Sequence, residues 1–196
     1  YLRRCLESLV HQTLKDLEIL VVDDGSTDHS PEILSEFENN YPGRVRVIRK
    51  ENGGQASARN LGIRECIGDY VGFVDSDDYV DTAMYEEMLR AALANNCDMV
   101  ECSYHYLQEK DGQQKELATR GNIRQYRDRK DMFIDPMTCP WNKLIRREIL
   151  LREGMEFPEG RIYEDTAFCI KLIPYLQRET YVDRPFVSYI LRETST

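Results

Sequence analysis

The chain has 196 residues, of which 41% are hydrophobic and 31% are charged, with a formal net charge of -9. This length suits one domain with a sizeable core, and the composition is that of an ordinary soluble globular protein. The acidic balance argues against nucleic acid as a partner, because nucleic-acid-binding proteins usually present a basic face. We also expect no transmembrane segment and no signal peptide, since no apolar run approaches the roughly 20 residues that span a bilayer.

The first part of the chain alternates between helical and strand-like patterns. Apolar residues recur at helical spacing from Leu2, and Pro31 suits the first turn of a second helix. Strands are predicted over residues 17–22, 44–48, 69–74 and 98–104; helices are predicted from residue 2, after Pro31, after the glycine-rich turn within 52–66, and over 82–95. This alternation predicts an α/β fold with a doubly wound, mostly parallel sheet and helices on both faces.

The second part is less regular. Residues 107–122 are polar and suit either a loop or a hairpin around Asp111-Gly112. Short helices are predicted over 125–134, 142–154 and 163–176, the last limited by Pro174, and closing strands over 179–183 and 185–191. No repeat or low-complexity linker divides the sequence, so we expect a single domain.

The cysteines are scattered, form no C-x-x-C pair, and lie in several cases within apolar periodic segments. Their even number would permit disulfides, but this placement favours reduced thiols in the core and a cytoplasmic protein. The positions are Cys5, Cys66, Cys97, Cys102, Cys139 and Cys169.

Two acidic clusters follow predicted strands. Asp23 and Asp24 come directly after the strand over 17–22, and Asp75, Asp77 and Asp78 follow the strand over 69–74. Ligands of open α/β sheets bind beyond the carboxyl ends of the strands, and carboxylates that converge there repel one another unless a cation or hydrogen-bond donors neutralise them. A hard divalent cation with a phosphate-bearing ligand explains both clusters economically. Solvated turn residues are the alternative.

Motifs along the chain carry a resemblance to a known family. In order they are "EILVVDDGSTD", "NGGQASARNLGI", "DYVGFVDSDDYV", "WNKLIRREIL" and "YEDTAF". Together they resemble a family 2 glycosyltransferase with the GT-A fold, over nearly the whole chain. The resemblance implies an inverting enzyme that moves a sugar from a nucleotide-diphosphate sugar, most often a UDP-sugar, to a hydroxyl of a glycan or lipid-linked acceptor, with Mn²⁺ or Mg²⁺.

The same resemblance divides the domain, residues 1–196, into a nucleotide-sugar-binding half over 1–105 and an acceptor and catalytic-base half over 106–196. It implies a role in polysaccharide biosynthesis, in the cytoplasm or peripherally at the inner face of a membrane. Family members usually begin with an apolar strand before the first helix, which this chain lacks. We therefore expect an upstream strand outside the sequence given.

Position by position, the resemblance assigns roles to the acidic clusters. Asp23 matches the residue that hydrogen-bonds the nucleobase, Asp75 the residue near the ribose or the metal, and Asp77 the ligand of the metal that bridges the diphosphate. The run "DSDD" leaves this register open, so Asp77 and Asp78 could exchange roles. Asp24 is expected to orient the neighbouring loop and the "GST" backbone.

The glycine-rich turn and the helix after it resemble the next part of the donor site. Gly53 and Gly54 would let the backbone approach the nucleotide closely. Arg59 matches a basic residue beside the nucleotide, with Asn60 in support. The alternative is that Arg59 pairs with an acidic neighbour.

Glu164-Asp165 resembles the family's "ED" motif, in which the aspartate is the general base. An inverting displacement at the anomeric carbon needs one carboxylate to accept the proton of the acceptor hydroxyl. The metal would act as a Lewis acid on the leaving diphosphate. The alternative is an acidic helix N-terminus favoured by the helix dipole.

Further residues are candidates for the acceptor side. Trp141 and Lys143 are expected there, although Trp141 equally suits the core. A basic run could meet a phosphate-bearing acceptor, but a solvated helix face is favoured. Its members are Arg120, Arg124, Arg127, Arg129 and Lys130, and Arg192 is a further candidate contact to the diphosphate.

Three other classes of protein compete with this interpretation. A receiver domain also places an acidic pair after a strand, but its D-x-x-M-P type loop is missing. A haloacid-dehalogenase-like phosphatase would need an early D-x-D-G-T motif, which is also missing. A catalytically inactive sugar-nucleotide-binding relative would be expected to have lost Asp77 or Asp165, and both are present.

Overall fold

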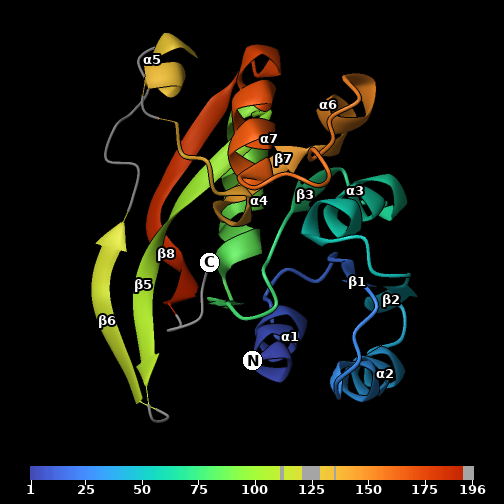
Figure 1. Cartoon of the computed structure of the whole chain (residues 1–196). Coiled ribbons are helices and arrows are strands. Elements are labelled where there is room, and N and C mark those ends of the chain that lie inside the picture. Colours follow the sequence, from blue (N-terminus) through green and yellow to red (C-terminus); the bar gives the residue numbers. More distant parts are fainter. Residues whose placement is uncertain (111–112, 121–128, 135, 192–196) are drawn as a thin grey trace.

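The computed structural model describes residues 1–110, 113–120, 129–134 and 136–191 (Figure 1). Its α-helices are α1 (Leu2–Val10), α2 (Ser30–Asn40), α3 (Gln55–Glu65), α4 (Met84–Asn95), α5 (Arg129–Ile134), α6 (Arg147–Arg152) and α7 (Glu164–Leu172), and its 3-10 turns are η1 (Pro140–Asn142) and η2 (Ile173–Tyr175). Its strands are β1 (Ile19–Asp23), β2 (Val45–Arg49), β3 (Tyr70–Gly72), β4 (Tyr79–Val80), β5 (Met99–Lys110), β6 (Gln113–Arg120), β7 (Lys143–Arg146) and β8 (Glu179–Leu191).

The strands of the described residues form two sheets. β1 and β2 pair in parallel, and six strands form the larger sheet in the order β3-β7-β5-β8-β4, with β6 also on β5. β5 is the centre of this sheet. It pairs in parallel with β8, and antiparallel with β7 through its first residues and with β6 through its second half.

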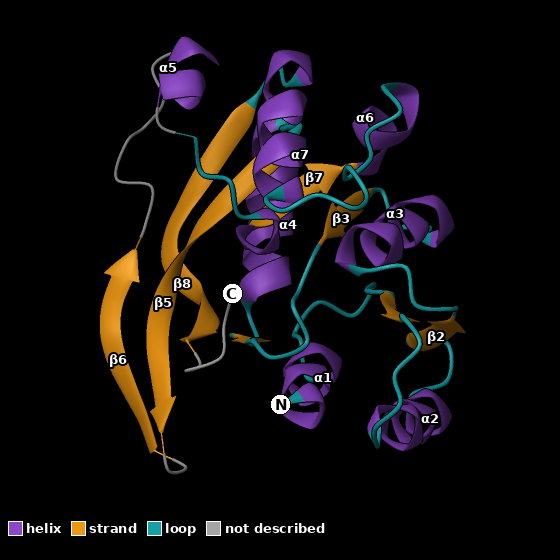
Figure 2. Ribbon diagram, in the orientation of Figure 1, coloured by secondary structure: helices purple, strands orange, loops and turns teal. Residues whose placement is uncertain are grey.

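Alternating side chains of the large sheet build a core on each face. Met99 and Ile145 point into the cluster that contains α7 and α6, whereas Val100 and Leu144 point into the cluster that contains α4. A third cluster joins α1 and α2 to the small sheet. Figure 2 shows these two helices beside β1 and β2, at the end of the molecule away from α5. The predicted α/β class with helices on both faces is confirmed.

The expectation of a mostly parallel sheet needs correction, because the sheet is mixed. Among the described pairings, only β1–β2 and β5–β8 are parallel, whereas β3–β7, β4–β8, β5–β6 and β5–β7 are antiparallel. The helix–strand alternation of the first part predicts parallel neighbours, but β3 pairs with β7, which comes from the second part of the chain. Short apolar runs carry no signal for such distant partners.

Two local predictions differ from the structure, and one alternative is confirmed. Residues 142–154 were predicted as one helix, but they contain β7 followed by α6, because residues 143–145 are buried within the sheet. The two closing strands are one strand, β8, whose register with β5 shifts around Pro185. The hairpin alternative for residues 107–122 is confirmed by the β5–β6 pairing; Asp111 and Gly112 lie outside the described residues.

Candidate active site

The two adjacent aspartates after β1 have different partners. Asp23 is buried, and its Oδ1 accepts a hydrogen bond from the backbone N–H of Ser26 at 3.0 Å. Its Oδ2 lies 3.9 Å from Nε of Arg49, the residue opposite it in the β1–β2 register. Asp23 therefore closes the turn after β1 and faces one partly exposed guanidinium.

Asp24 turns toward the glycine-rich segment. Its carboxylate accepts hydrogen bonds from Lys50 Nζ at 2.5 Å and from the backbone N–H groups of Gly53 and Gly54 at 2.9 and 2.7 Å. Burial alone would raise the pKa of Asp24, but Lys50 and the two N–H groups outweigh it and leave the pKa below its ordinary value. Asp24 thus has a structural role, as predicted, but its carboxylate orients the turn before α3, whereas Ser26 of the "GST" backbone is bonded by Asp23.

The two glycines are needed for the shape of this turn. Gly54 has a φ of +85°, which side-chain-bearing residues rarely adopt, and a Cβ on Gly53 would lie 2.8 Å from Lys50 Nζ and 2.9 Å from Ser57 Oγ. Their N–H groups are engaged by Asp24. A contact of Gly53 and Gly54 with a nucleotide stays a prediction.

Arg59 on α3 connects the acidic clusters of the two parts of the chain. One arm of its guanidinium, Nη2, lies 2.6 Å from Asp75 Oδ1, and the other, Nη1, lies 3.3 Å from Glu164 Oε1. Gln55 Nε2 donates to the same Asp75 oxygen at 3.2 Å. The predicted alternative of an acidic partner for Arg59 is therefore confirmed, and its partners belong to both predicted motifs.

The carboxylates in the run from Asp75 to Asp78 differ in burial. Asp78 is 1% exposed, and its Oδ1 accepts the backbone N–H of Ile190 at 2.8 Å. Burial raises the pKa of Asp78 to about 7. Asp78 thus ties β4 to β8 and is unsuited to a solvent-facing metal, whereas Asp75 and Asp77 are only half-buried.

The residues present fit one kind of divalent cation site. In the described part of the chain, no group of three or more His, Cys, Asp or Glu side chains gathers to hold a metal. Mg²⁺ is commonly held by one or two carboxylates together with the phosphates of a substrate, and such a site needs no larger protein cluster. The half-buried carboxylates of Asp75 and Asp77 have the hard oxygen donors that this site requires.

Asp165 lies in the first turn of α7, where its Oδ1 accepts the backbone N–H of Thr166 at 2.6 Å. Tyr163, just before the helix, has a left-handed φ of 63°. Burial raises the pKa of the Cys139 thiol to about 11, and both Asp165 and Asp75 add to this rise through their negative charge. Asp165 and Asp75 therefore lie within electrostatic reach of the same thiol.

The core alternative for Trp141 is confirmed, and the expected position of Lys143 on the acceptor side is wrong. Trp141 is 5% exposed and stacks on Tyr189, with ring centroids 5.2 Å apart. Lys143 is 2% exposed, and its Nζ lies 3.1 Å from Glu101 Oε1. Both side chains belong to the interior, because they lie between the sheet and the residues packed on it.

The remaining sequence candidates contribute little to this site. Arg120 is exposed on β6, and its guanidinium lies over the ring of Tyr106. Lys130 is exposed on α5, while Arg124, Arg127, Arg192 and the side chain of Arg129 lie outside the described residues. All six cysteines are free thiols, as predicted. No helix in the described ranges is long and apolar enough to cross a membrane.

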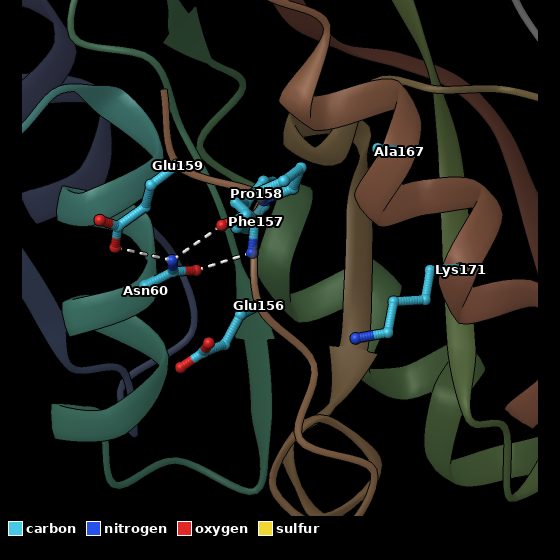
Figure 3. Close-up of a pocket in the computed structure, with 7 residues that line it drawn as sticks. All are labelled: Asn60, Glu156, Phe157, Pro158, Glu159, Ala167 and Lys171. Carbon is cyan, nitrogen blue, oxygen red and sulfur yellow. Dashed lines mark hydrogen bonds between the residues drawn. The ribbon is translucent and has the colours of Figure 1, made fainter. Parts of the chain in front are cut away.

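Asn60 is a buried polar residue whose partner the sequence did not indicate. Its amide is bonded to the backbone of Phe157, beside a hollow of about 560 Å³ (Figure 3). The hollow is lined by Asn60, Glu156, Phe157, Pro158, Glu159, Ala167 and Lys171. Asn60 and Phe157 are 97 residues apart, so no local pattern could have paired them.

Comparison with known proteins decides the family. The model of the family "Glycosyl transferase family 2" matches residues 1–153. The chain belongs to this family. EpsJ of Bacillus subtilis (strain 168), described as an uncharacterized glycosyltransferase, is 34% identical over 98% of this chain and 57% of its own length. The glycosyltransferase GlyA of Streptococcus pneumoniae serotype 4 is 30% identical over all of this chain and 29% of its own length.

Solved structures show the same fold. The crystal structure of S. aureus TarS 1–349 in complex with UDP-GlcNAc matches with a TM-score of 0.83 and 23% sequence identity, over all of this chain and 56% of that one. A second TarS structure, in complex with UDP, matches with a TM-score of 0.80, 22% identity and coverage of 97% of this chain and 56% of that one. This family 2 chain therefore spans little more than half the length of the TarS chains and of EpsJ.

Proposed function

We propose that this chain is the catalytic domain of an inverting glycosyltransferase that moves a sugar from a UDP-sugar to a hydroxyl of a glycan or lipid-linked acceptor. One observation carries the proposal. Arg59 binds both Asp75, which follows β3, and Glu164, the neighbour of Asp165, so the acidic cluster after β3 and the motif that contains the proposed base meet around one guanidinium. Membership of family 2 and the UDP and UDP-GlcNAc complexes of TarS support a UDP-sugar donor.

The donor would lie at the carboxyl ends of β1 and β3. Asp23 would accept a hydrogen bond from the uracil base, and Asp75 would hold the ribose or the metal. Gly53 and Gly54 would line the nucleotide, and the positive charge of Arg59 would face the diphosphate. Asp75 and Asp77 would hold a Mn²⁺ or Mg²⁺ ion, whose chemistry is to neutralise charge on the leaving diphosphate.

Asp165 would be the general base. As the acceptor oxygen bonds to the anomeric carbon, its proton passes to a carboxylate oxygen of Asp165. The bond between that carbon and the diphosphate breaks, and the electron pair leaves on the phosphate oxygen. A single displacement from the opposite side inverts the anomeric configuration and needs no covalent intermediate on the enzyme.

The organisation of the whole protein belongs to the same proposal. Residues 1–105 would bind the nucleotide sugar, and residues 106–196 would supply the base and the acceptor contacts. β5 crosses this boundary and pairs with β7 and β8, so the two halves share one sheet. We propose that the reaction belongs to polysaccharide biosynthesis and takes place in the cytoplasm or at the inner membrane surface.

The first test is nucleotide binding. The melting temperature is measured with UDP, GDP and dTDP, each with and without Mn²⁺, for the wild type and Asp77→Ala. A ligand at 100 times its Kd stabilises by about 2.7 kcal/mol, so we expect a shift of a few degrees with UDP that needs both Mn²⁺ and Asp77. Equal shifts with all nucleotides, or an undiminished shift in Asp77→Ala, would contradict the assigned donor site.

The second test is sugar transfer. Asp165→Asn should keep the UDP-dependent shift and lose at least ~10²-fold in transfer, as expected when a positioned base is removed. Glu148→Gln, at an exposed position on α6, is the matched control and should transfer normally. Unchanged transfer in Asp165→Asn would remove Asp165 from the mechanism. UDP binding without transfer in the wild type would favour a catalytically inactive, nucleotide-sugar-binding protein.

A further inference from the structure

The amide of Asn60 holds one residue of a distant loop by both of its backbone polar groups. Its Nδ2 donates to the carbonyl oxygen of Phe157 at 2.9 Å, and its Oδ1 accepts from the N–H of Phe157 at 2.7 Å (Figure 3). A further contact joins Nδ2 to Glu159 Oε1 at 3.3 Å. Asn60 is 2% exposed, so losing these bonds would leave polar groups buried without partners.

The ring of Phe157 carries this attachment to α7. It stacks on Phe168 with centroids 3.9 Å apart and an angle of 5° between the planes. The guanidinium of Arg59 lies 5.2 Å from the centre of the same ring. Phe73, just after β3, meets the ring edge-on at 5.4 Å. Phe157 therefore contacts residues from three parts of the chain, and Asn60 fixes its backbone.

These contacts connect the two halves of the proposed site, the donor side on α3 and the base side on α7. Asn60 follows Arg59 on α3, and Phe168 lies on the helix that begins with Glu164 and Asp165. Because Arg59 is also held by Asp75, loss of the Asn60 amide would leave the donor-side ion pair in place. What would change is the placement of α7 relative to α3.

We infer that Asn60 is a positioning residue, which acts through Phe157 to align α7, and hence Asp165, with the donor-binding helix α3. This inference rests on the proposed function for the role of Asp165. In an inverting displacement the acceptor oxygen, the base and the anomeric carbon must be aligned together. A displacement of about 1 Å by a residue remote from the chemistry can cost on the order of 10²-fold in rate.

The test compares Asn60→Ala with Ile63→Ala, which removes another buried side chain of α3 but leaves the Asn60 amide intact. Asn60→Ala should lower kcat for transfer roughly 10- to 100-fold while the Kd for UDP changes little. Ile63→Ala should lower the melting temperature and leave kcat near the wild-type value. Equal losses of kcat in the two variants, or a loss in Asn60→Ala that appears only in the Kd, would overturn the inference.

A second variant keeps the test decisive if Asn60→Ala does not fold. Asn60→Asp is nearly isosteric, but its carboxylate would face both the carbonyl oxygen of Phe157 and the carboxylate of Glu159 and be repelled by them. Protonation restores a donor there, so the ratio of its kcat to that of the wild type should rise as the pH falls. A ratio that does not depend on pH would contradict the assigned hydrogen bond.

Hydrogen exchange separates this inference from the proposed function. The backbone amides of residues 157–168 should exchange faster in whichever Asn60 variant folds than in Ile63→Ala, whereas those of β1 and β2 should not differ. If the wild type transfers no sugar, the proposed function fails, and this exchange comparison still decides whether Asn60 holds α7. Unchanged exchange over residues 157–168 would refute the inference whatever the activity.

Discussion

Two groups of opposite charges in this molecule look alike in the sequence and differ in the structure. Lys143 and Glu101 face each other across the antiparallel β5–β7 pair, and their side chains are 3% and 4% exposed. Arg59 contacts Asp75 and Glu164 from α3, and these three side chains are 10%, 22% and 15% exposed. The Lys143–Glu101 pair is enclosed within the sheet. The Arg59 group is partly open to solvent and joins the acidic cluster after β3 to the first turn of α7.

This difference separates a structural pair from the group to which we assign ligand binding in the proposed function. Burial alone would lower the pKa of Lys143, but the charge and hydrogen bond of Glu101, together with the nearby Cys169 and Cys139, outweigh it and raise the pKa. Lys143 also donates to the Cys139 carbonyl and to Asn142 Oδ1, so the pair is bound to its surroundings. The carboxylates around Arg59 retain some exposure, so an anionic ligand can compete for that guanidinium. We therefore use the partial burial of a charged group, and not the presence of charge alone, to choose the proposed binding site.

The largest effect on stability is expected at the closed pair. Lys143→Met leaves the Glu101 carboxylate buried without its cation, which should lower the free energy of unfolding by about 3–5 kcal/mol. The double variant Lys143→Met with Glu101→Leu should recover most of this loss, because neither charge is then buried. Urea unfolding of the three proteins measures both values. A single variant as stable as the wild type would refute the structural role of the pair.

A smaller effect, on binding instead of stability, is expected at the open group. Arg59→Lys keeps the positive charge but loses the planar fork that reaches both carboxylates, so the affinity for UDP should fall roughly tenfold. The melting temperature without ligand should change little. Calorimetric titration with UDP gives the affinity, and Arg64→Lys, an exposed arginine later on α3, is the matched control. Unaltered affinity in Arg59→Lys would make the two groups equivalent and weaken the comparison.

Asp78 extends the comparison to a buried carboxyl whose Oδ2 has no hydrogen-bond partner among the described residues. Its pKa is raised from 3.8 to about 7, so between these values the native chain holds a proton that the unfolded chain has released. This proton contributes stability that is complete below about pH 4 and is lost as the pH rises to about 7. Asp78→Asn removes this dependence.

The stability of the wild type relative to Asp78→Asn should therefore fall across that window, by up to roughly 1.4 kcal/mol per pH unit. Denaturant unfolding of both proteins at several pH values gives the difference at each pH. A difference that is constant between pH 4 and pH 7 would show that Asp78 titrates normally.

The smallest effect is expected at a fully open pair. Arg3 on α1 donates to both carboxylate oxygens of Glu36 on α2, at 2.8 and 2.7 Å, and both side chains are nearly half exposed. Arg3→Ala should shift the melting temperature by no more than roughly 2 °C, because water and salt screen such pairs. A larger shift would mean that the exposure of an ion pair does not predict its contribution to stability.

Much of the molecule was predictable from local patterns. The apolar run before Asp23 predicted the end of a strand to within a few residues. The glycines at 53 and 54 predicted a turn, and the acidic pair at Glu164 predicted the start of a helix. The α/β class, the family and the order of the helices and strands in the first part, apart from the short β4, followed from the same motifs. Local backbone preferences and the hydrophobic period act over short distances, so the sequence alone determined these features.

The partners of the charged and polar groups were decided only by the tertiary structure. The strand opposite Lys143, the burial that separates Asp78 from Asp77, and the 97-residue interval between Asn60 and Phe157 depend on contacts between distant segments. A carboxylate or an amide has the same local sequence signal whether it faces water or a buried partner. Its role is set by which groups lose water together, and only the folded chain determines that.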